Sequence, residues 1–149
     1  MDLSYLTILL VEDDENDILL IQRAFRKAKL SNPLQVVRDG EQAVAYLRGD
    51  SEFADRSRSP LPIVILLDLK LPRLGGHEVL GWLRAQESLK RIPVVVLTSS
   101  KESADVNRAY DLGANSYLVK PVEFDNLIEM VKNIDMYWFV MNQNPMPRY

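Results

Sequence analysis

Short, continuous runs of branched aliphatic residues constrain the fold of this chain more than any other feature. Four runs rich in Val, Ile and Leu are bounded by polar or turn residues, at positions 7–11, 63–67, 94–97 and 117–119, and a weaker one lies at Leu34–Val37. Runs this short that lack polar–apolar alternation are typical of strands buried on both faces, as in a parallel sheet. We therefore expect parallel strands at these positions.

Helical patterns separate the runs. Ile18, Ile21, Phe25 and Ala28 recur at steps of three and four residues, and so do apolar residues between positions 124 and 134. The resulting alternation of strand and helix predicts a doubly wound α/β sheet with helices on both faces. With 149 residues, of which 47% are hydrophobic, the chain has the size and composition of one domain, so we expect a single domain over residues 1–149.

Charge and composition exclude several classes of function. A formal net charge of −3 gives no long-range attraction to nucleic acid or to an anionic membrane. There is no cysteine for a disulfide, a thiol nucleophile or a thiolate metal site, and His77 is the single histidine. We expect His77 to be an exposed surface residue. The N-terminus lacks the features of a signal peptide and no apolar run reaches membrane-spanning length, so a cytoplasmic location is expected.

Chemically active side chains follow each of the four strong runs. They are Glu12, Asp13 and Asp14 after the first, Asp68 after the second, Thr98, Ser99 and Ser100 after the third, and Lys120 and Pro121 after the fourth. Because the ends of parallel strands point the same way, these groups should converge at one edge of the sheet, where open α/β sheets bind ligands. For Asp13 or Asp14 taken alone, a helix N-cap role is an equally good interpretation.

The predicted cluster needs a cation. Two carboxylates about 4 Å apart repel each other by roughly 4 kcal/mol at an effective dielectric constant of about 20. Lys120 can offset one charge, and a hard divalent cation can offset the rest, with Mg²⁺ favoured over Ca²⁺ where protein ligands are few. A metal ion, a lysine and a carboxylate nucleophile together suit phosphoryl transfer.

The motifs at these strand ends resemble the receiver domain of two-component response regulators. They read LVED at 10–13, LDLKLP at 67–72, LTS at 97–99 and YLVKP at 117–121, and the resemblance spans about residues 5–135. It implies a flavodoxin-like sheet with strand order 2-1-3-4-5. It also implies a regulator rather than an enzyme, phosphorylated on aspartate by a sensor histidine kinase and signalling through conformational change and protein contact.

The resemblance assigns roles to the residues around the phosphoryl group. Asp68 corresponds to the phosphoacceptor, and Mg²⁺ would be bound by Glu12, Asp13, Asp68 and the backbone carbonyl of Lys70.

Further roles follow from the same resemblance. Thr98 would donate a hydrogen bond to the phosphoryl group and Lys120 would form an ion pair with it. Tyr117 matches the aromatic switch residue, and the Lys120–Pro121 peptide bond is cis in typical members.

Three alternatives compete with this interpretation. A phosphatase of the haloacid dehalogenase type needs a second acid two residues after its nucleophile, where this chain has Lys70. A flavin or dinucleotide binder needs glycines and free backbone amides after the first strand, where this chain has four consecutive acids, at 12–15. A degenerate receiver that acts without phosphorylation would lack some of the expected side chains, and all of them are present.

Two segments outside the motifs suggest partners. The polar stretch at 48–60 is expected to be a surface loop. The last helix is long, and the tail after it, at 142–149, is expected to be frayed. In these two features the chain resembles small regulators paired with cyanobacterial phytochromes. Residues 136–141 (MYWFVM) are six consecutive apolar residues, which one helix face cannot bury. We expect a homodimer through this last helix; the alternative is that the segment folds back onto its own domain.

Overall fold

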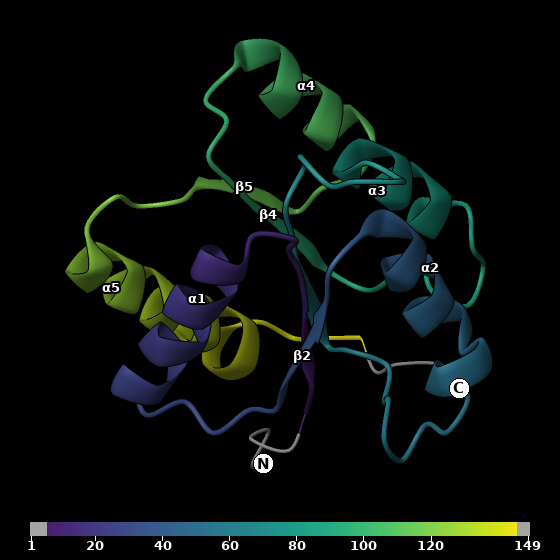
Figure 1. Cartoon of the computed structure of the whole chain (residues 1–149), viewed down its shortest axis with the longest axis horizontal. Coiled ribbons are helices and arrows are strands. Elements are labelled where there is room, and N and C mark those ends of the chain that lie inside the picture. The colour runs from purple at the N-terminus through teal and green to yellow at the C-terminus, as the bar shows by residue number, and fades with distance from the viewer. Residues whose placement is uncertain (1–5, 146–149) are drawn as a thin grey trace.

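The computed structural model describes residues 6–145 and shows a five-stranded parallel sheet in the order β2-β1-β3-β4-β5 (Figure 1). The strands are β1 (Ile8–Val11), β2 (Leu34–Val37), β3 (Val64–Leu67), β4 (Val94–Thr98) and β5 (Ser116–Val119). The predicted fold class and strand order are confirmed, and each apolar run agrees with its strand to within one residue. The central strands β1, β3 and β4 are buried along their whole length, which explains their lack of alternation.

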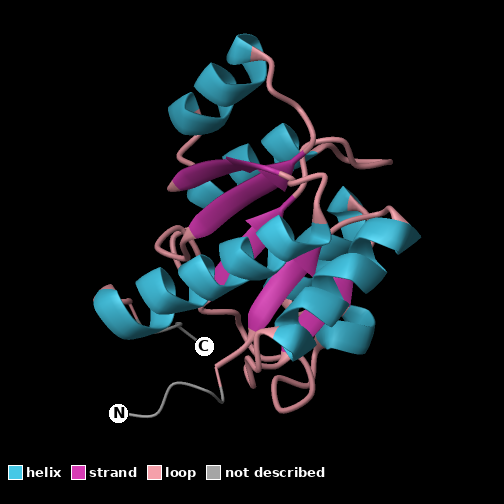
Figure 2. Cartoon of the chain, turned by 90° about the vertical axis from the view of Figure 1, so that its left-hand side faces the viewer, coloured by secondary structure: helices cyan, strands magenta, loops and turns pink. Residues whose placement is uncertain are grey.

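Within the described residues, five α-helices cover the sheet on both sides (Figure 2). They are α1 (Glu15–Lys27), α2 (Gly40–Arg48), α3 (Gly76–Arg84), α4 (Ser103–Asp111) and α5 (Phe124–Asp135). The side chains of β1 alternate between two cores: Ile8 and Leu10 pack with α1 and α5, whereas Leu9 and Val11 pack with α2 and α3. Helix α4 buries only Ala109 among its described residues, so it is held less tightly than the other helices.

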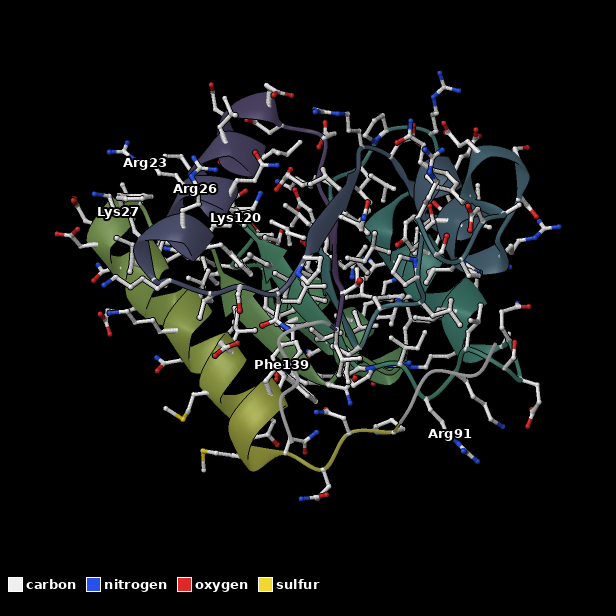
Figure 3. All side chains as sticks on the ribbon, turned by 90° about the horizontal axis from the view of Figure 1, so that it is seen from below. Arg23, Arg26, Lys27, Arg91, Lys120 and Phe139 are labelled. Carbon is white, nitrogen blue, oxygen red and sulfur yellow. The ribbon has the colours of Figure 1, made fainter. Side chains whose placement is uncertain are left out.

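The chain continues past α5 as a π-helix, η2 (Met136–Met141). Its wider turn is closed by the N–H of Asn142, which donates to the carbonyl oxygen of Tyr137 at 2.7 Å. Trp138 and Phe139 point back into the α1/α5 core, and Figure 3 shows Phe139 directed toward the body of the molecule. Met136, Tyr137 and Met141 remain exposed. The alternative of folding back is therefore correct for Trp138 and Phe139, two of the five residues in this segment whose side chains the structure describes.

Hydrogen bonds hold both the segment expected to be a surface loop and the start of the tail expected to be frayed. The 48–60 segment contains a short 3₁₀ helix, η1 (Ser51–Phe53), and the guanidinium of Arg56 donates to the carbonyls of Tyr46 and Leu47 at the end of α2. In the tail, Asn144 donates to the carbonyl of Trp138. The prediction of a frayed end is wrong for Asn142 and Asn144, because the backbone N–H of Asn142 and the side-chain amide of Asn144 donate to carbonyls at the end of the helix. Residues 146–149 lie outside the described part of the chain.

Candidate functional site

The sheet register brings the predicted acids together. Val11 pairs with Leu67 at the ends of β1 and β3, and the N–H of Asp68 donates to the carbonyl of Val11 at 3.0 Å. Asp68 and Glu12 therefore leave adjacent strands at the same level. Carboxylate oxygens of Glu12, Asp13 and Asp68 lie within 4.8 Å of one another. Asp13 is exposed while the other two are buried, so this acidic triad is open to solvent on one side.

Lys120 reaches this triad from the end of β5, which β4 separates from β3 in the sheet. Its backbone N–H donates to the carbonyl of Thr98 at 2.8 Å, which extends the pairing of β5 with β4 beyond the strand end. Its Nζ atom donates to Asp68 Oδ2 at 3.1 Å and to Glu12. Burial alone would lower the pKa of Lys120, but hydrogen bonds to Asp17 and Glu12 and the charge of Asp68 outweigh it and raise the pKa. Lys120 therefore stays charged.

Glu12 is the most deeply buried acid of the triad, with 1% of its side chain exposed. Burial raises the pKa of Glu12 to about 7, and the negative charge of Asp68 acts in the same direction, while the hydrogen bond from Lys120 opposes both. One lysine does not fully compensate these acids. The oxygen-only triad, open on one side, fits a hard divalent cation.

Two further acids, Asp14 and Asp17, lie beside the triad. Asp14 is the N-cap of α1, and its Oδ1 accepts the N–H of Asp17 at 3.0 Å. The N-cap interpretation is thus correct for Asp14, and Asp13 belongs to the triad instead. Asp17 is a site residue that the motifs did not indicate: its Oδ2 accepts from Lys120 Nζ at 2.8 Å. A helical signal was present, because Asp17 stands one turn before buried Ile21 on the same stripe of α1.

The loop after β3 is fixed by the start of α3. The N–H of Gly76 donates to the carbonyl of Leu69 at 2.9 Å. A Cβ atom on Gly76 would lie 2.3 Å from the carbonyl oxygen of Asp68, so only glycine allows this approach. Within the loop, the N–H of Lys70 donates to Asp68 Oδ1 at 3.4 Å and its side chain is exposed. Asp68 is thereby held from both flanks.

The hydroxyl side of the site joins β4 to α4. Thr98 is fully buried at the end of β4. Ser100 Oγ donates to Asp105 Oδ2 at 2.5 Å, and the carbonyl of Ser100 accepts the hydroxyl of Tyr117 at 3.0 Å. Burial raises the pKa of Tyr117. Tyr117 is half-buried and packs against a small cluster that contains Leu69, Val96 and Ala109.

Two expectations near the site are wrong. His77 is half-buried, and its Nε2 donates to the backbone carbonyl of Asp105 at 3.2 Å, because α3 and α4 pack closely enough for an imidazole to bridge them. Among residues 6–145 no peptide bond is cis, so the Lys120–Pro121 bond is trans here. The two isomers before proline differ by only about 0.5–1 kcal/mol, which a sequence motif alone does not decide.

A doubly wound parallel sheet with an acidic triad, a lysine and a buried hydroxyl at its carboxyl edge defines the class of receiver domains. Residues 8–132 match the response regulator receiver domain, and the chain belongs to this family. It is a response regulator of the phosphoacceptor type rather than a conventional enzyme.

Particular relatives match nearly the whole chain. The probable methanogenesis regulatory protein FilR2 of Methanothrix harundinacea is 45% identical over 94% of this chain and 88% of its own length. The response regulator Rcp1 of Synechocystis is 42% identical over 88% of this chain and 87% of its own length. The Mn²⁺-bound structure of Rcp1 superposes with a TM-score of 0.83 at 40% identity, and the match covers 94% of this chain and 99% of that structure. The phosphorylated cyanobacterial phytochrome response regulator RcpA superposes with a TM-score of 0.88 at 40% identity, over 95% of this chain and 99% of its own.

No helix within residues 6–145 is both long and apolar enough to cross a membrane.

Proposed function

We propose that Asp68 is the phosphoacceptor of this response regulator. The observation that carries the proposal is the convergence of Asp68, a triad able to hold a metal ion, and Lys120 at one edge of the sheet. A carboxylate oxygen of Asp68 attacks the phosphorus of a phosphohistidine, the P–N bond breaks, and the leaving imidazole takes up a proton. Lys120 would stabilise charge on the phosphoryl oxygens, and Thr98 would donate its hydroxyl hydrogen bond to them.

Mg²⁺ is the cation we assign to the triad. Glu12, Asp13 and Asp68 provide hard oxygen ligands, and the carbonyl of Lys70, in the loop beside Asp68, would complete the protein's share. The remaining positions would be filled by water and by the phosphoryl group. When bound, the ion would neutralise charge on the phosphoryl oxygens. Rcp1, which is 40% identical in its solved structure, has an Mn²⁺-bound form, and this supports a divalent cation as a ligand of the present chain.

Transfer from a phosphorylated sensor histidine kinase tests this function. The wild-type chain should take the label in the presence of Mg²⁺, and Asp68→Asn should take none, because an amide cannot form the acyl phosphate. Asp55→Asn is the matched control, since Asp55 is an exposed aspartate of the 48–60 segment. Undiminished transfer to Asp68→Asn would refute the assignment. A phytochrome-type kinase should be the more efficient donor, as the likeness to RcpA suggests.

Tyr117 is the proposed switch. Its hydroxyl is bonded to the carbonyl of Ser100, next to buried Thr98, so movement of Thr98 toward a phosphoryl group would alter the space open to the ring. Beryllium fluoride, a phosphoryl mimic, should shift NMR signals from Asp68 through Thr98 to Tyr117 and α4. Shifts confined to the acidic triad would contradict a switch.

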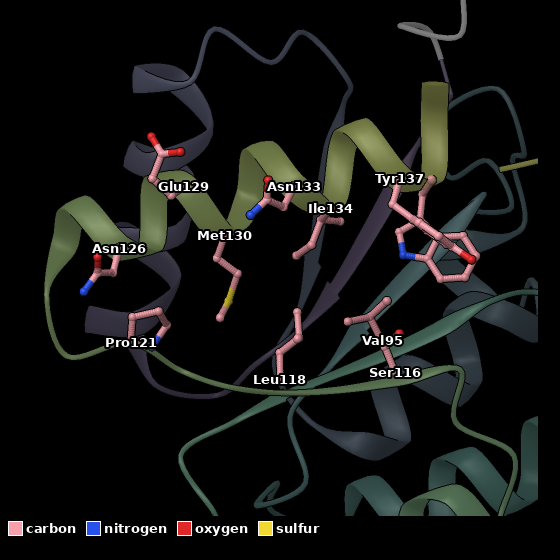
Figure 4. Close-up of a pocket in the computed structure, with 11 residues that line it drawn as sticks. Val95, Ser116, Leu118, Pro121, Asn126, Glu129, Met130, Asn133, Ile134 and Tyr137 are labelled. Atoms are coloured by element: carbon pink, nitrogen blue, oxygen red, sulfur yellow. The ribbon is translucent and has the colours of Figure 1, made fainter. Parts of the chain in front are cut away.

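We propose that residues 1–149 form a single receiver domain that acts in the cytoplasm. We also propose that this domain dimerises through the end of α5. A groove of about 430 Å³ lies between α5 and β5, and Figure 4 shows Met130 and Ile134 directed across it toward Leu118. Exposed Tyr137 lines one end of this groove. A two-fold partner could therefore place its own Tyr137 against the groove, as an isologous interface requires.

Sedimentation tests the dimer. Tyr137→Glu should give a folded monomer, because a charge would enter an apolar contact. Tyr110→Glu on α4 is the control, since Tyr110 is 49% exposed and Tyr137 is 51% exposed. Phe139 is unsuitable for the same substitution, because it is buried in its own core and a charge there would disrupt the fold. A wild-type chain that stays monomeric at micromolar concentration, with and without beryllium fluoride, would refute the dimer.

A further inference from the structure

Lys120 binds a carboxylate outside the acidic triad. Its Nζ atom donates to Asp17 at 2.8 Å as well as to Asp68 and Glu12, and Figure 3 shows Lys120 beside α1. An ammonium group has three protons to donate, so these three partners use all of its donors. A phosphoryl oxygen can therefore gain Lys120 only when one of the contacts is released.

The three carboxylates differ in how easily they can lose the lysine. The exposed fraction of the side chain is 1% for Glu12, 8% for Asp68 and 36% for Asp17. A buried carboxylate that loses its partner is left as a poorly hydrated charge or must take up a proton, and either outcome is unfavourable. Asp17 can be hydrated by solvent in place of the lysine. It is the partner whose release requires the least free energy.

Asp17 is also fixed in position before any phosphoryl group arrives. It lies in the first turn of α1, and its N–H donates to the capping carboxylate of Asp14 at 3.0 Å. Buried Ile18 and Ile21 anchor the same turns of α1 to the sheet. The position of the Asp17 carboxylate relative to Lys120 is thus fixed by the packing of α1.

We propose that Asp17 is a positioning residue that holds Lys120 toward α1 in the unphosphorylated protein and releases it to the phosphoryl group. This inference rests on the proposed role of Asp68. Asp17 acts through Lys120: it competes with the phosphoryl oxygens for the ammonium group and lowers the affinity of the site for a phosphoryl group. Removing its charge should strengthen phosphoryl binding without disturbing the fold.

Beryllium fluoride titration in saturating Mg²⁺, followed on the backbone amides of Asp68 and Thr98, tests the proposal. Asp17→Asn should bind the mimic roughly three- to fivefold more tightly than the wild type, the range expected for losing one partly exposed ion pair. Asp17→Glu keeps the carboxylate and should restore the wild-type affinity. The ζ-nitrogen NMR signal of Lys120 should also shift in Asp17→Asn before the mimic is added.

Asp14→Asn is the matched control. It removes one negative charge from the same end of α1, and asparagine remains a good N-cap, but the lysine bonds to Asp17 and not to Asp14. Equal affinities for Asp17→Asn and Asp14→Asn, with the wild type binding normally, would overturn this inference alone. A wild-type chain whose Asp68 amide does not respond to the mimic would overturn both this inference and the proposed function.

Discussion

Lys120 connects the chemistry of the site to the stability of the unphosphorylated protein. The residue was expected to face a phosphoryl group, and in the structure it also compensates Glu12, an acid that is almost fully buried. Leaving a buried carboxylate without its partner costs more free energy than forming the ion pair gains. Lys120 is thus a structural residue whenever no cation fills the triad.

Loss of this lysine should therefore destabilise the metal-free protein. In EDTA, Lys120→Ala should lower the free energy of unfolding by about 3 kcal/mol, because Glu12 and Asp68 lose their cationic partner. Urea titration measures the loss, and added Mg²⁺ should recover part of it. Lys70→Ala is the control, as Lys70 is an exposed lysine of the same edge. Equal urea midpoints for the two variants in EDTA would contradict the structural role.

The first residue of α3 determines where Asp68 lies. Gly76→Ala would place a methyl group 2.3 Å from the carbonyl oxygen of Asp68 and 2.6 Å from Leu69 Cα. The atoms that the methyl group meets belong to the backbone and cannot move aside easily. The resulting strain should lower the free energy of unfolding by about 2 kcal/mol. Urea titration should show the loss, and Mg²⁺ affinity should fall with it.

Gly75→Ala provides the control for this element. Its Cβ would meet its nearest atom, Glu78 Oε1, at 3.6 Å, which is an ordinary contact, and its backbone conformation is open to any residue. The free energy of unfolding of Gly75→Ala should lie within about 0.5 kcal/mol of the wild-type value. If Gly75→Ala and Gly76→Ala proved equally stable, the close approach of α3 to Asp68 would be wrong.

Elements were predictable from the sequence where burial alone decides them. The strands buried on both faces gave continuous apolar runs, and the common direction of these strands predicted that Glu12, Asp13, Asp68 and Lys120 lie together. Asp17 was missed because it reaches the site from a helix, where its role depends on how α1 packs against the sheet. The inward turn of Trp138 and Phe139 depends on the π-helix η2, which has no strong local signature.

For the molecule as a whole, the triad should couple cation binding to folding. A ligand that binds only the folded state stabilises it by about 2.7 kcal/mol at a concentration of 100 times its dissociation constant. Mg²⁺ should therefore raise the melting temperature of the wild-type chain. Asp13→Asn should lose most of this increase, because Asp13 is the exposed member of the triad and we propose it as a ligand of the cation. An undiminished increase in Asp13→Asn would remove Asp13 from the proposed ligands.

The central claim for the whole molecule is that it stores one phosphoryl group on Asp68 in the presence of a divalent cation. Intact-protein mass spectrometry after incubation with a small acyl phosphate, followed by mapping of the modified peptide, measures this directly. With Mg²⁺ the wild-type chain should gain a single phosphoryl group, mapped to Asp68, and with EDTA it should gain none. Modification at another residue, or equal modification in EDTA, would contradict the claim.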